Sequence, residues 1–72
     1  MTKNDTVNHP SHYTQGDIEC IDAIKASMPI SEFIGYLKGN ALKYLWRYEG
    51  KGGVEDLRKC AWYLQKLIDQ FE

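Results

Sequence analysis

The sequence has no apolar run near the roughly 20 residues that a membrane-spanning helix needs, and its N-terminus has no hydrophobic signal segment. It has only two cysteines and no Cys-x-x-Cys pair, so neither a disulfide framework nor a zinc site is expected. No segment shows sustained two-residue alternation, which disfavours a β-fold. These absences predict a cytoplasmic protein with reduced thiols and with no metal or cofactor.

The chain is short as well. Its 72 residues make one small domain. A chain of this size buries only about 60% of the surface that it exposes when unfolded, so its core is marginal when it stands alone. We therefore expect a homo-oligomer.

Charge is distributed unevenly along the chain. Residues 1–35 hold two lysines and five acidic residues, whereas residues 36–66 hold seven Lys and Arg and three acidic residues. The second half therefore predicts an anionic partner. The net charge of −1 disfavours a protein whose main task is to bind duplex DNA, so nucleic acid is not the expected partner.

Apolar residues recur at helical spacing in three segments. The spacing predicts a first helix over 17–27 and a third helix over 54–71. Between them, a second helix begins at a cap at Ser31 and ends at the glycines of 50–53. Residues 1–16, rich in turn-forming residues, are interpreted as an ordered arm. We therefore expect an all-α domain of three helices over 17–72. Gly39 lies inside the second helix, where it predicts either a break or a close approach to the backbone.

The expected core consists of one stripe on each of the two longer helices. Cys20 and Cys60 lie beside apolar stripes and are interpreted as small core residues. The buried stripe of the second helix is Phe33, Leu37, Ala41, Tyr44 or Leu45, and Tyr48. The inner face of the third helix is Leu57, Ala61, Leu64, Ile68 and Phe71, with Cys60 and Leu67 at its margin.

Polar residues form a second stripe on the helix that follows Ser31. Tyr36, Asn40, Lys43 and Arg47 recur every three or four residues and so share one face. Arg and Lys can bind phosphate, Asn can bind a base or ribose, and Tyr can stack on a ring. This pattern predicts a nucleotide site. The alternative is an ordinary solvated helix face.

The glycine-rich segment Gly50-Lys51-Gly52-Gly53 leads into a helix N-terminus, where free backbone N–H groups and the helix dipole favour anions. Lys51 adds charge there. The segment lacks the order of a Walker A loop, and an ordinary helix–helix turn explains its glycines equally well. Glu55 and Asp56 follow it, either as complements to the helix dipole or as ligands of a ribose or a metal.

The arm contains a further cluster of functional groups, His9-Pro10-Ser11-His12-Tyr13. Its imidazoles, hydroxyl and phenol can bind phosphate or transfer a proton near neutral pH. The alternative is an arm held by its own hydrogen bonds. No catalytic residue is assigned from the sequence. The predicted ligand-binding residues are His9, Ser11, His12, Tyr13, Tyr36, Asn40, Lys43, Arg47, Lys51 and Gly52.

Taken together, these segments resemble a small phage family catalogued as domain of unknown function 3310, whose members are often labelled nucleotide kinases. The resemblance covers roughly residues 7–69. It implies nucleotide binding in the cytoplasm of an infected host cell. The residues that match the family's motifs, and that the resemblance implies as binding residues, are His9, His12, Tyr13, Asn40, Lys43, Arg47 and Lys51. The motifs that carry it are Asn8 to Tyr13, Ile18 to Asp22, Gly39 to Arg47, Lys51 to Gly53, and Glu55 to Leu57.

Three functions compete at this point. The first is a protein that binds and sequesters a host nucleotide or a nucleotide-derived signal, which would serve a phage against host defence. The second is a nucleoside monophosphate kinase without a Walker motif, which must hold donor and acceptor in line. The third is a module that binds a host protein through Trp46, Trp62 and Tyr36.

Overall fold

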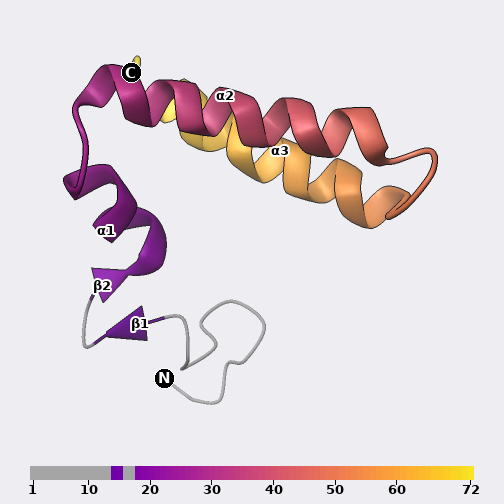
Figure 1. Ribbon diagram of the computed structural model, residues 1–72, viewed down its shortest axis with the longest axis horizontal. Coiled ribbons are helices and arrows are strands. Elements are labelled where there is room, and N and C mark those ends of the chain that lie inside the picture. The colour runs from indigo at the N-terminus through magenta and orange to yellow at the C-terminus, as the bar shows by residue number, and fades with distance from the viewer. Residues whose placement is uncertain (1–13, 16–17) are drawn as a thin grey trace.

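The computed structural model describes residues 14–15 and 18–72. Two long antiparallel helices, α2 (Ile30–Arg47) and α3 (Val54–Asp69), lie side by side as a hairpin, and the short α1 (Cys20–Ala26) precedes them (Figure 1). Two-residue strands β1 (Thr14–Gln15) and β2 (Ile18–Glu19) pair antiparallel ahead of α1. The predicted all-α class with three helices is confirmed. Among the described residues, no helix is long and apolar enough to cross a membrane.

The first helix is shorter than predicted. It begins at Cys20 rather than at residue 17, because Ile18 and Glu19 pair with β1 instead of joining the helix. It ends before Ser27, whose N–H and Oγ both donate to the carbonyl of Ile24, at 3.1 and 2.7 Å. Cys20 is exposed, so its expected place in the core is wrong.

The second helix differs from the prediction at its start and at Gly39. It begins at Ile30, and the carbonyl of Pro29 accepts the N–H groups of Glu32 and Phe33, at 3.0 and 3.1 Å. Ser31 therefore lies in the first turn and is not the cap. The helix continues through Gly39, and a Cβ added there would meet no described atom within 4 Å. Neither the predicted break nor the predicted close approach occurs.

The core lies between α2 and α3 and is small. Phe33, Leu37 and Ala41 are buried as predicted, each at 8% exposure or less. Tyr44 and Tyr48 are half-buried, and Leu45 is 49% exposed, so it is not the core residue that its spacing suggested.

The predicted inner face of α3 is wrong. Leu57, Leu64 and Ile68 are 37–46% exposed, and Phe71, beyond the helix end, is 72% exposed. On α3, the buried or half-buried positions that face α2 also recur at helical spacing. They lie about 100° around the helix from the predicted inner face. They are Asp56, Cys60, Tyr63 and Leu67. The helix is thus rotated so that much of its apolar stripe lies at the edge of the hairpin.

The turn between the helices requires both of its last glycines. Gly53 has a φ of 56°, in the region that favours glycine, and its N–H donates to the carbonyl of Tyr48 at 2.8 Å. A Cβ on Gly52 would collide with the carboxylate of Asp56. The predicted end of α2 at this segment is confirmed. The backbone conformation requires Gly53, and the close approach of Asp56 requires Gly52.

Two glycine substitutions should shift stability in opposite directions. Gly39→Ala should raise the free energy of unfolding by up to about 1 kcal/mol, because Ala is the better helix former and the site has room. Gly52→Ala should lower it, because the added methyl group displaces the Asp56 carboxylate. Urea unfolding followed by circular dichroism measures both. A stabilising Gly52→Ala would contradict the described turn.

Candidate anion-binding site

A cluster of aromatic rings fills one edge of the α2–α3 hairpin. Tyr44 of α2 and Tyr63 of α3 stack with ring centroids 5.9 Å apart and an interplanar angle of 14°. Tyr36 meets Tyr63 edge to face at 6.2 Å, and Trp62 meets it at 5.0 Å. Both helices therefore contribute rings to a single rigid surface, and such pairs stabilise it beyond their simple burial.

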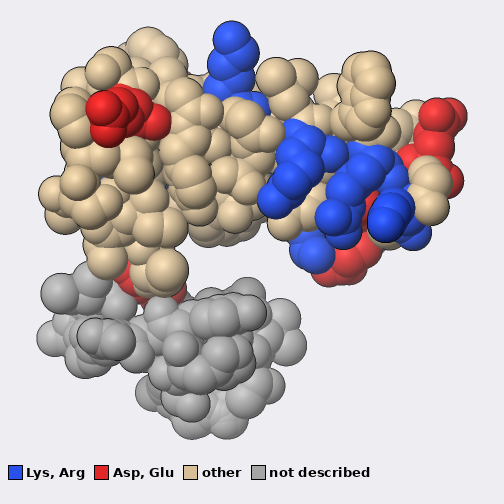
Figure 2. All heavy atoms as spheres, in the orientation of Figure 1, with Lys and Arg blue, Asp and Glu red and all other residues tan. Residues whose placement is uncertain are grey.

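Three cations surround the Tyr44 ring. Lys43 Nζ, Arg47 Cζ and Lys59 Nζ lie 4.6, 5.3 and 5.4 Å from its centroid. At these distances each cation is attracted to the ring, and together they concentrate positive charge in one place. Figure 2 shows Lys and Arg side chains gathered over the half of the hairpin that ends in the connecting turn. We call Lys43, Tyr44, Arg47, Lys59 and Tyr63 the cationic edge.

A buried carboxylate holds one of these cations in place. Asp56, 1% exposed, accepts from Arg47 Nε at 3.0 Å and from the N–H of Gly52 at 2.9 Å, both through Oδ2. Its other oxygen, Oδ1, has no hydrogen-bond partner among the described residues. The hydrogen bond from Arg47 lowers the pKa of Asp56 below its usual 3.8, against the raising effect of burial. The carboxylate is therefore ionised at neutral pH and fixes Arg47 beside Tyr44.

The cationic edge keeps an excess of positive charge. Within the described ranges, neither Lys43 nor Lys59 has a carboxylate within ion-pair distance, and Asp56 is the acid that faces Arg47. The Arg47 side chain is still 42% exposed and uses Nε for the ion pair. Three exposed cations beside one buried carboxylate leave this edge with a net positive charge, which is complementary to an anion with more than one charge.

The backbone N–H groups of the turn at 50–53 hold the turn together, whereas the sequence predicts that they bind an anion. The N–H of Lys51 donates to the carbonyl of Arg47 at 3.0 Å, that of Gly52 to Asp56, and that of Gly53 to Tyr48. These three donors are used within the molecule. Anion binding by Lys51 and Gly52 stays a prediction, and the ammonium group of Lys51 is the group that could provide it.

The structure brings together part of the predicted site. Tyr36, Lys43 and Arg47 lie along the same edge, as their spacing indicated. Asn40 is half-buried, and its Nδ2 donates to the carbonyl of Tyr36 at 2.9 Å, one turn back in the same helix. Four predicted residues, His9, Ser11, His12 and Tyr13, lie outside the described residues.

Sequence reasoning missed the contribution of α3. The sequence patterns give Lys59 no role, offer Tyr44 as a core residue, and place Asp56 at a helix dipole, a ribose or a metal. Asp56 is buried, and its Oδ2 accepts from Arg47 and from Gly52, while a contact with a ribose or a metal stays a prediction. The spacing of Asp56, Lys59 and Tyr63, three and four residues apart, places them on neighbouring positions of one helix face. That spacing was the available signal.

The fold and this edge define a small helical-hairpin domain with a cationic and aromatic face. A model of the family described as a protein of unknown function (DUF3310) matches residues 7–65, and the chain belongs to this family. No solved structure matches the chain.

Two curated phage proteins are similar to it. The gene 1.7 protein of Enterobacteria phage T3 is 42% identical over 69 residues, covering 89% of this chain and 42% of that protein. The nucleotide kinase gp1.7 of Escherichia phage T7 is 42% identical over 62 residues, covering 79% of this chain and 32% of that protein. The chain thus spans less than half the length of these relatives.

The Tyr63 hydroxyl gives the aromatic cluster a spectroscopic signature. Burial, together with hydrogen bonding to Tyr36, raises the pKa of Tyr63 from 10.0 to about 12. In an absorbance titration of tyrosinate, one phenol should therefore ionise late, and Tyr63→Phe should lack that late step. The folded state holds this proton more tightly than the unfolded state does. The contribution of the Tyr63 hydroxyl to the free energy of unfolding is therefore present below pH 10 and is lost as the pH rises towards 12. A titration unchanged in Tyr63→Phe would contradict this environment.

The Asp56 contacts should make stability depend on acid pH. A lowered pKa in the folded state stabilises the protein above the unfolded value of 3.8, and the effect disappears as the pH falls through the lowered pKa. Asp56→Asn should therefore be less stable than wild type at pH 7, and the difference should shrink below pH 3.8. Urea unfolding at several pH values measures it. A difference independent of pH would contradict an ionised, paired Asp56.

Proposed function

We propose that this domain binds a nucleotide, or a nucleotide-derived signal, through phosphate groups held at the cationic edge. The phosphates would contact Lys43, Lys59 and the exposed part of Arg47, and the ring of the nucleotide would lie against the neighbouring aromatic side chains. Charge-assisted hydrogen bonds from Arg and Lys to phosphate are among the stronger polar contacts in proteins.

One observation carries the proposal: three cations converge on the ring of Tyr44, and the facing carboxylate belongs to a buried residue already paired with Arg47. A merely solvated helix face spreads its charges among acids of opposite sign. Here two lysines have no ion-pair partner in the part of the chain that is described. The net positive charge that remains at this edge favours an anionic ligand.

The class of anion comes from the relatives. The phage T7 protein is named a nucleotide kinase, and the phage T3 protein shares the same matched segment. A nucleotide combines a multiply charged phosphate with an aromatic ring, which matches cations surrounding stacked tyrosines. The general proposal is therefore a nucleotide-related function. The more specific proposal is that the domain sequesters a nucleotide without turning it over.

Phosphoryl transfer is the second candidate, and the name of the phage T7 relative favours it. A kinase must bind a donor and an acceptor together and neutralise the charge that develops between them. The described residues form one cationic edge on one hairpin. The chain also spans only 32% of that relative, so an activity of the whole relative is not assigned to this segment.

A host-protein module is the third candidate. Trp46 is 90% exposed, and Trp62 is 47% exposed while it contacts Tyr63. A large exposed indole is a typical anchor in a protein interface. If this reading holds, Trp46→Ala would abolish partner binding whereas Lys43→Ala would not.

Binding to the cationic edge can be tested by calorimetry with mono-, di-, tri- and cyclic nucleotides. Lys43→Ala and Lys59→Ala should each weaken binding about tenfold or more, because each removes a charge-assisted contact. The affinity of wild type should also fall with salt. Lys25→Ala on α1 removes the same charge from an exposed site and should leave the affinity unchanged.

The recovered ligand separates the two leading functions. Chromatography after incubation with a monophosphate and a triphosphate should return both intact if the domain sequesters its ligand. A newly phosphorylated product that is absent with Lys43→Ala would establish transfer instead. Equal affinities for wild type, Lys43→Ala and Lys59→Ala would overturn the proposed site.

A further inference from the structure

A fourth cation lies over an aromatic ring further along α3, outside the cationic edge. Lys66 Nζ is 5.3 Å from the centroid of the Trp62 ring, a distance at which an ammonium group is attracted to an indole. Lys66 is half-buried, whereas Trp62 is 47% exposed and so leaves ring surface open to a ligand. A cation beside an exposed indole offers both groups that a nucleotide needs, one for a phosphate and one for a base.

The positive charge of Lys66 is not neutralised within the described part of the chain. The ion pair found there lies at Asp56, in the first turn of α3. Asp69 stands three residues after Lys66, at a spacing from which a carboxylate can pair with it. Its Oδ1 instead accepts from Gln65 Nε2 at 3.0 Å. The ammonium group of Lys66 is therefore available to an anionic ligand.

A row of rings connects Lys66 to the cationic edge. Tyr63 stacks on Tyr44 with centroids 5.9 Å apart and meets Trp62 edge to face at 5.0 Å. The cationic edge surrounds the first ring of this row, and Lys66 lies over the last. Lys59 and Lys66 are seven residues apart, which places them on nearly one face of α3 and about 10 Å apart along its axis. Ring surface thus separates two cationic positions.

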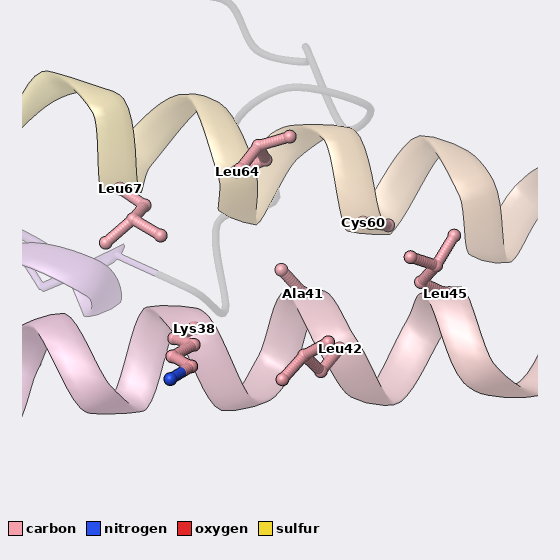
Figure 3. Close-up of a pocket in the computed structure, with 7 residues that line it drawn as sticks. All are labelled: Lys38, Ala41, Leu42, Leu45, Cys60, Leu64 and Leu67. Carbon is pink, nitrogen blue, oxygen red and sulfur yellow. The ribbon is translucent and has the colours of Figure 1, made fainter.

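The described residues on the other side of the hairpin form an apolar groove instead. This groove, about 230 Å³, is lined mainly by leucines, Leu42 and Leu45 of α2 and Leu64 and Leu67 of α3 (Figure 3). Among the described residues that line it, Lys38 alone is charged and none is aromatic. Burying a charged group against such a lining is costly. A charged ligand that extends beyond the cationic edge would therefore follow the row of rings.

We propose that Lys66 and Trp62 form a second subsite, so that the domain binds a nucleoside that carries a phosphate on both its 5′ and its 3′ side. The inference rests on the proposed function, because the cationic edge holds the first of these phosphates. Lys66 holds the second, and the base between them lies against Trp62. A nucleoside 3′,5′-bisphosphate and a 5′-phosphorylated dinucleotide share this chemistry.

The second subsite does not make the hairpin a phosphoryl-transfer site. Transfer requires the phosphates of donor and acceptor to meet in line. Lys66 lies at the far end of the row of rings from Tyr44, so the two phosphates are held apart on either side of one nucleoside. A ligand bound in this way is retained intact.

Calorimetry with three ligands of each common nucleoside tests the second subsite. The ligands are the 5′-monophosphate, the 5′-diphosphate and the 3′,5′-bisphosphate. The last two have the same number of phosphates and differ only in where the phosphates are attached. For at least one base, wild type should bind the bisphosphate about tenfold tighter than the monophosphate, because Lys66 adds one charge-assisted contact.

Lys66→Met removes the ammonium group and keeps an aliphatic side chain beside Trp62. It should weaken binding of the bisphosphate about tenfold and leave the affinities for the monophosphate and the diphosphate within about twofold of wild type. Lys25→Met makes the same change of charge at an exposed site on α1 and should alter none of them. A 5′-phosphorylated dinucleotide distinguishes the two sources. The ligand of the pair that binds wild type more tightly, and loses that advantage in Lys66→Met, is the one that the subsite fits.

Two results would overturn the second subsite. One is that wild type binds the bisphosphate and the dinucleotide no more tightly than the monophosphate. The other is a loss in Lys66→Met that is equal for all ligands. The proposed function fails by a different result, namely an unchanged affinity for the monophosphate in Lys43→Ala and Lys59→Ala.

Indole fluorescence decides the matter if Lys66→Met does not fold. The chain has two tryptophans, and Trp46 is 90% exposed, so Trp46→Phe leaves Trp62 as the reporter with little effect on packing. In this variant the bisphosphate should change the emission of Trp62, and the diphosphate should not. An emission that responds equally to both ligands, or to neither, would contradict a base held against Trp62.

Discussion

The buried carboxylate of Asp56 is the contact on which the rest of this structure depends. It lies at the first turn of α3, accepts from Arg47 on α2 and from Gly52 in the turn, and so joins all three parts of the hairpin. The ionised carboxylate is stabilised there by its two contacts at Oδ2, and its removal would leave Arg47 without its counter-charge. The same contact sets the rotation of α3, since Asp56 must face α2.

That rotation divides the hairpin into two unlike edges. With Asp56, Cys60, Tyr63 and Leu67 toward α2, Lys59 lies on one side of α3 and the aliphatic stripe on the other. Cations and tyrosines gather on the first edge, and leucines on the second. A helix with its apolar stripe turned fully inward would bury more surface within one chain but would move Lys59 away from Tyr44.

Local patterns predicted the elements of this fold better than their mutual orientation. The helices, the turn at 50–53 and the burial of Phe33 and Leu37 followed from periodicity and glycine content. The direction of the apolar stripe of α3 did not, because periodicity identifies an apolar face without identifying the surface that covers it. The cationic edge followed only in part from the sequence, for the same reason. Spacing on α2 placed Lys43 and Arg47 together, whereas Lys59 joins them through a tertiary contact.

The geometry of the hairpin bears on the choice between sequestration and phosphoryl transfer. A transfer site needs two nucleotides whose phosphates meet, and sharing between subunits is the simplest way for so short a chain to supply both. The described residues form one cationic edge on one hairpin, which accounts for the phosphates of one nucleotide. A donor site would have to come from residues outside the described part of this chain, or from the further length that the phage relatives have.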